Sequence, residues 1–408
     1  MRALAEARRT VVEAMVPLPV ISVPLAEAAG LVLASDVVAP HDVPPFPNSA
    51  VDGFAVRAVD LVSVPIELVV VEDLPAGRVA SHRVLTGTAI RIMTGAPMPD
   101  GADSVVMVED TEEQSGTVTI RRAVRTGENV RPAGGDLASG AVALEAGTRL
   151  GPAAMGVLAT LGVTLPRVRR RPVVAVASTG DELLPSEAVT LRPGTIRDSN
   201  RPMLTALLHE SGMEVRDLGI IPDDARLLRS TLEEAASTAD AVVTTGGVSM
   251  GAHDLVKQVL GELGRVEFWK VAMQPAKPFA FGFLGETPFF GLPGNPVSVA
   301  VAFEQFLRPA MLRRLGAIRL FRPRMRAIAA EDLVTNPGKV VFVRVAIDDD
   351  GSVRPAGGQS SNVLSALAAA DAFAVVPVGV GTVAVGEVVT VEMWRAAETR
   401  TLEEAEDD

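Results

Sequence analysis

Residues 244–254 read Thr-Thr-Gly-Gly-Val-Ser-Met-Gly-Ala-His-Asp, and this stretch decides the fold of the middle of the chain. It follows the β-branched run 241–243, which predicts a buried strand, and it precedes apolar residues at helical spacing. Such a loop can bring backbone N–H groups and a helix N-terminus close to a phosphate. It matches neither the Walker pattern nor the three-glycine dinucleotide pattern. Taken alone, it is equally compatible with phosphate binding and with a tight strand–helix turn.

Strands and helices alternate around this loop from Pro172 to about Leu315. Strands are expected at 173–177, 214–218, 266–271, 279–283 and 289–291, and helices at 202–209, 226–236 and 296–315. This alternation predicts an open, mostly parallel α/β sheet with helices on both faces. The chain is therefore expected to be an α/β multidomain protein built around this unit.

The flanking regions have a different pattern. A helix is expected at 2–16, short strands separated by turns run to about residue 140, and a helix returns at 151–161. Beyond Pro323 the pattern again predicts a small β domain, followed by an acidic tail at 398–408. At about 100–200 residues per domain, a chain of 408 residues is expected to hold two to four domains.

Composition excludes several classes of function. The net charge of −12 argues against a broad nucleic-acid surface, and the absence of cysteine excludes disulfides, thiolate metal sites and cysteine nucleophiles. The sequence has no secretory signal pattern and no apolar run long enough for a membrane span, so a cytoplasmic protein that binds no membrane is expected. The basic run 167–171 is interpreted as a solvated linker between domains, with an anion site as the alternative.

Three strand-to-loop junctions of the central unit carry polar or glycine-rich sequence. They are 178–182 (Ser-Thr-Gly-Asp-Glu), the loop 244–254 and 291–296 (Gly-Leu-Pro-Gly-Asn-Pro). Ligands of open α/β sheets bind outside the carboxyl ends of the strands, so these junctions are expected to converge on one crevice.

The crevice would hold carboxylates beside lysines. Asp181, Glu182 and Asp254 are oxygen ligands of the kind Mg²⁺ prefers, while Lys270 and Lys277 can neutralise charge on a leaving phosphate. Lysine is scarce, since only Lys257, Lys270, Lys277 and Lys339 occur, and three of them follow the loop closely. The alternative for Asp181 and Asp254 is N-capping of the helices that follow.

The motifs along the chain resemble those of the molybdopterin molybdenumtransferases, a family whose eukaryotic relatives include gephyrin. The resemblance covers nearly the whole chain. It is carried by the segments 47–57 (Pro-Asn-Ser-Ala-Val-Asp-Gly-Phe-Ala-Val-Arg), 92–97, 178–183, Asp198-Ser199-Asn200, 245–249, Phe268-Trp269-Lys270 and 291–298.

The resemblance implies an elongated homodimer of four-domain chains. These are a split N-terminal α+β domain (1–43 and 140–171), an inserted β-rich domain (44–139), the α/β molybdopterin-binding domain (172–320) and a C-terminal β domain (321–397). It also implies the reaction, in which adenylated molybdopterin and molybdate give molybdenum cofactor and AMP with Mg²⁺. The implied protein partners are the adenylyltransferase of the pathway and molybdoenzyme apoproteins.

Site residues follow from the same resemblance, position by position. Asp254 and Glu182 are expected to bind Mg²⁺ or the pterin phosphate, Lys270 and Lys277 to lie beside substrate, and Arg344 and Ser361 to hold the molybdate oxyanion. Asp52, Thr94 and Asp136 are expected to reach the cleft from the inserted domain of the partner subunit. The remaining expected substrate-binding residues are Ser178, Thr179, Gly180, Asp198, Ser199, Asn200, Thr245, Gly246, Gly247, Ser249, Pro293, Asn295 and Pro296.

The sequence departs from the family pattern at three positions. Gln274 stands where many relatives have lysine, Ala276 where many have glycine, and Phe54 where tyrosine is common. Two alternative functions stay open, a molybdopterin adenylyltransferase and a non-catalytic scaffold of the gephyrin kind. The 48–57 segment and the flanking domains favour metal insertion over the first, and the retention of Glu182, Asp254 and Lys270 favours it over the second.

Overall fold

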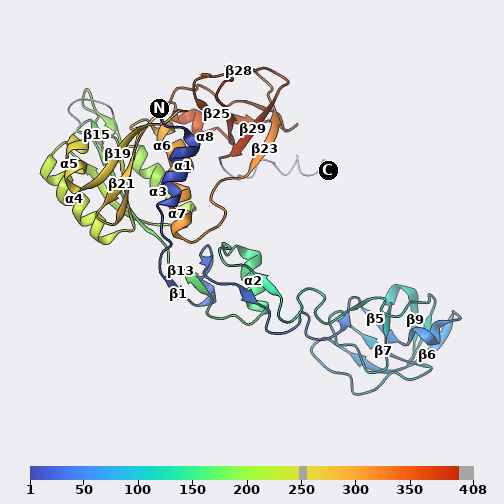
Figure 1. Ribbon diagram of the computed structural model, residues 1–408. Coiled ribbons are helices and arrows are strands. Elements are labelled where there is room, and N and C mark those ends of the chain that lie inside the picture. Colours follow the sequence, from blue (N-terminus) through green and yellow to red (C-terminus); the bar gives the residue numbers. More distant parts are fainter. Residues whose placement is uncertain (248–254, 395–408) are drawn as a thin grey trace. The chain divides into compact units, whose positions relative to one another are not determined.

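The computed structural model describes residues 1–247 and 255–394. The chain divides into two compact units, which we describe separately. One comprises Met1–Ile21, Gly30–Ala34 and the chain from Arg167 onward, and the other comprises Ser22–Ala29 and Ser35–Pro166. Both are drawn in Figure 1.

A six-stranded sheet forms the centre of the first unit, in the order β17-β14-β18-β22-β21-β19. The first four strands are parallel, and β21 and β19 are antiparallel additions at one edge. The strands β14, β18 and β22 are rich in apolar residues, as expected for strands covered on both faces, whereas the edge strand β17 carries Glu214, Arg216 and Asp217. The strand bounds are β14 Val173–Thr179, β17 Glu214–Ile221, β18 Ala241–Thr245, β19 Gly264–Lys270, β21 Pro278–Leu284 and β22 Thr287–Leu292.

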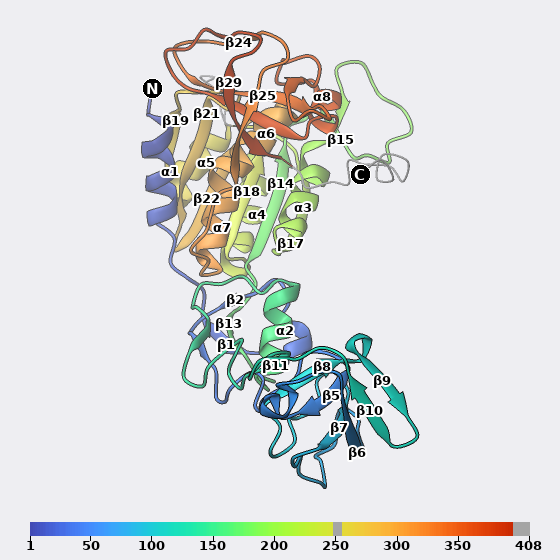
Figure 2. The ribbon, with the colours of Figure 1, turned by 90° about the vertical axis from the view of Figure 1, so that its right-hand side faces the viewer.

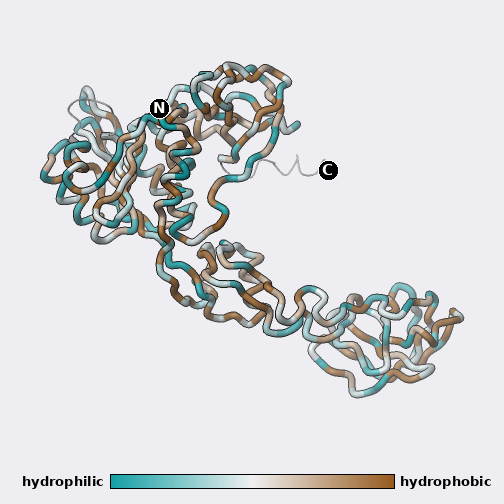
Figure 3. Tube along the Cα trace, in the orientation of Figure 1, coloured by the Kyte–Doolittle hydropathy of each residue, from teal (hydrophilic) through white to brown (hydrophobic). Residues whose placement is uncertain are grey.

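Helices cover both faces of this sheet, with α4 and α5 on one face and α1, α3, α6 and α7 on the other (Figure 1). Hydrophilic and hydrophobic residues alternate along α4 because only one side of that helix packs on the strands (Figure 3). Leu228 and Leu232 of α4 are buried against Val242 of β18 in the core of this layer. The helix bounds are α1 Leu4–Glu13, α3 Asn200–Glu210, α4 Ala225–Thr238, α5 Leu255–Leu263, α6 Pro296–Ala302 and α7 Arg308–Arg314.

A second sheet belongs to the C-terminal part of the same unit and lies beyond the carboxyl ends of the parallel strands (Figure 2). Its order is β20-β25-β27-β29-β23, and its first member β20 comes from the central α/β segment. β20 pairs in parallel with β25, placing Met273 opposite Val340. Backbone hydrogen bonds therefore join the two layers. The bounds are β20 Met273–Gln274, β23 Arg324–Ile328, β25 Val340–Ile347, β27 Ala372–Val376 and β29 Val388–Met393.

A π-helical segment, Phe303–Leu307, separates α6 from α7. It buries Gln305 completely, and the Gln305 side chain donates from Nε2 to Oε1 of Glu392 on β29 at 2.7 Å. The guanidinium of Arg8 on α1 donates to the amide oxygen of the same glutamine. The buried side-chain amide of Gln305 thus links α1, the helical segment between α6 and α7, and β29 of the C-terminal sheet.

The second unit is mainly β. Its six-stranded sheet has the order β8-β5-β7-β6-β10-β9, and Phe54 of β5 is fully buried in its core. The domain boundaries expected at 43/44 and 139/140 fall inside this unit and stay predictions. Its main elements are β5 Gly53–Val56, β6 Ile66–Leu74, β7 Thr88–Ile92, β8 Ser104–Met107, β9 Thr111–Gln114, β10 Thr117–Ile120 and α2 Pro152–Thr160.

The multidomain α/β fold class is confirmed, and two local expectations are wrong. The basic run is not a solvated linker, because Arg167–Arg169 forms strand β13, which pairs with Val32 and Leu33 of β2. Its next residue, Arg170, makes two 2.6 Å hydrogen bonds to Asp240. Asp181 caps no helix, since a turn and the short strand Leu183–Leu184 follow it, and its Oδ1 accepts a hydrogen bond from the Asp223 amide.

We expect Asp240→Asn to lower the free energy of unfolding by about 1–2 kcal/mol, since Arg170 is partly exposed to water. Burial opposes ionisation of Asp240, but hydrogen bonds from Arg170 and the Val173 amide outweigh it and lower its pKa. The carboxylate therefore stabilises the fold above its unfolded pKa, and this contribution is lost as pH falls through the lower folded pKa. Urea unfolding at pH 7 and near pH 3.5 measures this, with the exposed Glu286→Gln as control. If the difference in free energy of unfolding between the wild type and Asp240→Asn were larger near pH 3.5 than at pH 7, a stabilising Asp240 carboxylate would be contradicted.

Candidate active site

The carboxyl ends of four parallel strands lie at one edge of the central sheet. The strand register places Thr179 opposite Ile221 and Ser178 opposite Thr245, and Thr245 opposite Leu292. The first loop residues continue the ladder, since the Gly246 amide donates to the Leu292 carbonyl at 3.2 Å. The three junctions singled out in the sequence therefore start side by side, and a fourth, at residues 222–224, follows β17.

Glycine is required where two of these junctions touch. Gly246 and Gly247 have φ of 87° and 64°, in the left-handed region. A Cβ on Gly246 would lie 2.6 Å from the Thr179 carbonyl oxygen, and one on Gly247 would lie 2.3 Å from a methyl of Val256. The start of the loop after β18 can therefore pack against the end of β14 and against α5 only with glycine at both positions.

Asn200 joins the second junction to the third. Its buried side-chain nitrogen donates to Thr245 Oγ1 at 3.2 Å and to the Gly294 carbonyl at 2.7 Å. Asp198 holds the start of the same helix, because its Oδ1 accepts from the amides of Asn200 and Arg201. Asn200 and Asp198 thus position the second and third junctions without lining the cavity themselves.

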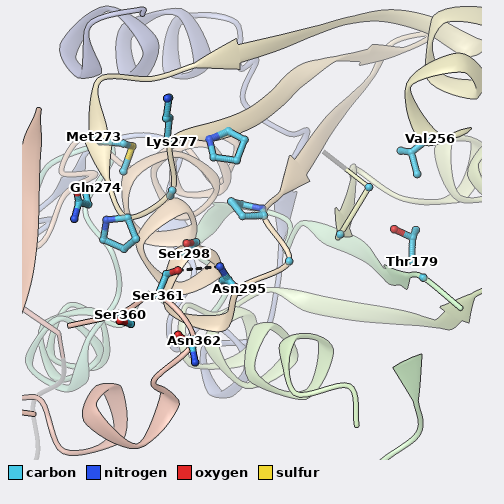
Figure 4. A pocket seen from close by; sticks show the side chains of 18 of the residues that line it. Thr179, Val256, Met273, Gln274, Lys277, Asn295, Ser298, Ser360, Ser361 and Asn362 are labelled. Carbon is cyan, nitrogen blue, oxygen red and sulfur yellow. Dashed lines mark hydrogen bonds between the residues drawn. The ribbon is translucent and has the colours of Figure 1, made fainter. Parts of the chain in front are cut away.

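The junctions line a cavity of about 1380 Å³ together with a loop of the C-terminal part. This volume exceeds the roughly 300–1,000 Å³ usual for a site that holds one small ligand. Figure 4 shows Thr179 and Val256 at one end and Gln274 and Lys277 at the other. The convergence expected from the topology is confirmed.

Carboxylates gather at the end near β14 and β17. Glu182 and Asp223 both line the cavity, and a Cβ on Gly180 would lie 2.3 Å from Glu182 Oε2, so the glycine makes room for this carboxylate. Burial, followed by the negative charges of Asp181 and Glu182, raises the pKa of Asp223. A bound cation would relieve this repulsion.

Cations gather at the opposite end. Lys277 and Lys339 are the positively charged side chains among the described lining residues, and neither takes part in an ion pair within the described chain. Lys277 follows Ala276, whose φ of 68° places a non-glycine residue in the left-handed region. Gln274 lines the same end without a charge.

A loop of the C-terminal part closes this end. Asn295 Nδ2 donates to Ser361 Oγ at 2.8 Å, the dashed bond in Figure 4, and the Val297 amide donates to the Ser361 carbonyl at 3.1 Å. The fully buried Arg344 lies beneath the loop and donates to the carbonyls of Gly358 and Ser360. Its Nε and Nη1 find no partner among the described residues, and burial lowers its pKa.

The expected site residues fall into four groups. Lining the cavity are Thr179, Gly180, Glu182, Gly246, Gly247, Lys277, Pro293, Asn295 and Ser361. Absent from its lining are Ser178, Asp198, Ser199, Asn200, Thr245, Lys270, Pro296 and Arg344. Ser249 and Asp254 lie outside the described residues, and Asp52, Thr94 and Asp136 belong to the other compact unit.

Within that other unit, Asp52 and Thr94 are direct partners. Asp52 Oδ1 accepts hydrogen bonds from the Thr94 amide and hydroxyl, each at 2.7 Å. These bonds lower the pKa of Asp52, which stays exposed together with Asp136. Their expected roles stay predictions.

Sequence reasoning missed several lining residues. Asp223 follows a parallel strand at the same sheet edge, so the rule that found the other junctions could have found it. Lys339, Gln359, Ser360 and Asn362 come from the C-terminal part, and no pattern within the α/β segment points to them.

Comparison with known proteins identifies the class as molybdopterin-biosynthesis proteins. The MoeA N-terminal region (domain I and II) matches residues 2–162, a probable molybdopterin binding domain matches 175–313, and the MoeA C-terminal region (domain IV) matches 326–394. The chain belongs to the MoeA family.

Individual relatives span nearly the whole chain. Molybdopterin molybdenumtransferase 2 of Mycobacterium tuberculosis is 41% identical over 397 residues, covering 95% of this chain and 98% of that protein. Molybdopterin molybdenumtransferase of Haemophilus influenzae is 40% identical over 374 residues, covering 90% and 92%. The crystal structure of the molybdopterin biosynthesis MoeA protein from Pyrococcus horikoshii OT3 has a TM-score of 0.84 at 31% identity, covering 96% of this chain and 100% of that one.

We expect Gly246→Ala to lower the free energy of unfolding by at least about 1–2 kcal/mol, the usual penalty for a side chain in left-handed backbone. The close approach to Thr179 adds to it. Gly294→Ala is the matched control, because this cavity glycine has φ outside the left-handed region and no atom within 4 Å of an added Cβ. Denaturant unfolding measures both, and equal effects would contradict the packing argument.

Proposed function

We propose that this chain is a molybdopterin molybdenumtransferase that inserts molybdenum from molybdate into adenylated molybdopterin with release of AMP. The observation that carries the proposal is the 41% identity, over 98% of its length, to a protein of that name. The large cavity supports it, because its lysine end suits one anionic substrate and its carboxylate end could hold a cation that binds the other.

The glycine-rich end suits the phosphate part of the adenylated substrate. Gly246 and Gly247 line this end without side chains of their own, which leaves room for a phosphate group to approach the strand ends. The lysine end suits the metal oxyanion, since Lys277, Ser361 and Asn362 offer donors and its described lining has no carboxylate.

Mg²⁺ fits the carboxylate end in its donor chemistry. Glu182 and Asp223 are oxygen ligands, and burial together with the nearby negative charges of Asp181 and Glu182 raises the pKa of Asp223, which a bound cation would counteract. Residues 1–247 and 255–394 hold no cluster of three potential metal-ligating side chains, so we propose that Asp254 completes the set. When bound, the ion would supply positive charge against the phosphate oxygens.

The roles of the chain's own groups follow from this arrangement. Glu182 and Asp223 orient the phosphate end, and Lys277 neutralises the oxyanion while AMP leaves. Arg344 holds the loop that carries Ser360 and Ser361 in place from below. We also propose a homodimer, a direct role of Asp52, Thr94 and Asp136 in catalysis, and a cytoplasmic location. None of the helices in the described ranges combines the length and apolar content that a membrane crossing requires.

The first test is turnover. Incubated with adenylated molybdopterin, molybdate and Mg²⁺, the protein is expected to release AMP and to activate a molybdenum apoenzyme. Asp254→Ala is expected to lower the rate about a hundredfold or more while the melting temperature stays unchanged. Consumption of ATP and free molybdopterin without AMP release from the adenylated form would instead establish an adenylyltransferase.

The second test concerns magnesium. We expect Glu182→Gln and Asp223→Asn each to raise the Mg²⁺ concentration for half-maximal rate about tenfold, with the exposed Glu187→Gln as control. Because the pKa of Asp223 is raised, Mg²⁺ competes with a proton there, so the affinity should increase with pH up to that pKa. Asp223→Asn should flatten this dependence. A steep dependence retained in Asp223→Asn would exclude Asp223 as the titrating ligand.

A further inference from the structure

The lysine end of the cavity, which Lys277 and Lys339 line, needs more than one positive charge to balance molybdate. Molybdate is a dianion, and a buried or half-buried anion needs matching positive charge. Lys277 supplies one charge, Gln274 beside it supplies none, and Arg344 is fully covered by the loop above it.

Lys339 is placed to supply the second charge. It lines the same cavity, it is half-buried, and it has no ion-pair partner among the described residues. Its backbone is held, since the Lys339 amide donates to the Asn336 carbonyl at 3.2 Å and the next amide, Val340, donates to Ala272 at 3.0 Å. The pairing of β20 with β25 thus fixes Lys339 next to the segment that carries Gln274 and Lys277.

Lysine is rare in this chain, so composition alone does not account for two lysines at one end of a cavity. The chain contains four lysines, and two of them, from segments more than 60 residues apart, reach one end of one cavity. A third, Lys257, packs its ammonium group over the Phe268 ring and is absent from the described lining.

We infer that Lys339 is an oxyanion-binding residue, which supplies from the C-terminal β domain the second positive charge that the neutral Gln274 does not provide. The inference rests on the proposed function. It assigns to Lys339 the metal oxyanion rather than the phosphate of the adenylated pterin, because Lys277 and Gln274 lie at the end of the cavity opposite Thr179 and Val256 (Figure 4).

Direct binding tests the inference independently of turnover. Titration calorimetry of the full chain with sodium molybdate and with sodium tungstate compares the wild type, Lys339→Met and Lys257→Met. We expect Lys339→Met to weaken molybdate binding by tenfold to a hundredfold, the range for a lost hydrogen bond to a charged group. Lys257→Met should bind as the wild type does. An unchanged dissociation constant in Lys339→Met would overturn the inference.

Two further variants separate charge from structure. Lys339→Arg should retain most of the affinity, and Gln274→Lys in the Lys339→Met background should restore it, because the charge returns to the same end of the cavity. Failure of both to bind better than Lys339→Met would assign the residue a structural role and overturn the inference.

Steady-state kinetics then show whether Lys339 acts on molybdate or on the phosphate of adenylated molybdopterin. In Lys339→Met the KM for molybdate should rise and the KM for adenylated molybdopterin should stay within about twofold. The opposite pattern would place Lys339 at the phosphate and overturn the inference. If the wild type releases no AMP at all, the proposed function fails, whereas the calorimetric comparison still decides on Lys339.

Discussion

The site depends on the parallel register of β17, β14, β18 and β22. Because each strand is hydrogen-bonded to its neighbour in the same direction, Thr179, Thr245 and Leu292 end at one level and their loops must leave at one edge. The start of the loop after β18 lies so close to β14 that a Cβ at residue 246 would be 2.6 Å from the Thr179 carbonyl oxygen. The glycines at 246 and 247 and the cross-link made by Asn200 are consequences of that crowding.

Charge separation within the cavity comes from combining two sheets. The α/β sheet alone places carboxylates at its strand ends, where burial and then the negative charges of Asp181 and Glu182 raise the pKa of Asp223. Positive charge comes from the segment after β20 and from the start of β25 in the other sheet, which the β20–β25 pairing joins. The described carboxylates and lysines of this cavity form no ion pairs with one another, so the two sets of side chains keep their opposite charges.

Strand and loop patterns predicted the α/β fold and the convergence of three junctions, because both follow from local periodicity and from a rule on parallel sheets. The features that could not be predicted depend on contacts between residues far apart in the sequence. Arg170 was interpreted as solvated because its partner Asp240 lies 70 residues away. Lys339 was missed because a different sheet carries it to the cavity. Ser178 and Asp198 are buried and absent from the described lining, and their expected roles stay predictions, since a motif position does not tell whether a side chain faces the cavity or the protein interior.

The π-helical segment Phe303–Leu307 makes the length of this chain, and not only its residue types, a structural constraint. A π turn holds one more residue than an α turn, and each residue advances an α-helix by about 100°. Deleting one residue there would convert the π turn into an α turn, so α6 and α7 could keep their faces, but the wider turn that brings Gln305 to Arg8 and Glu392 would be lost. A substitution there changes one contact, whereas a one-residue deletion would remove the turn through which a single amide contacts both Arg8 and Glu392.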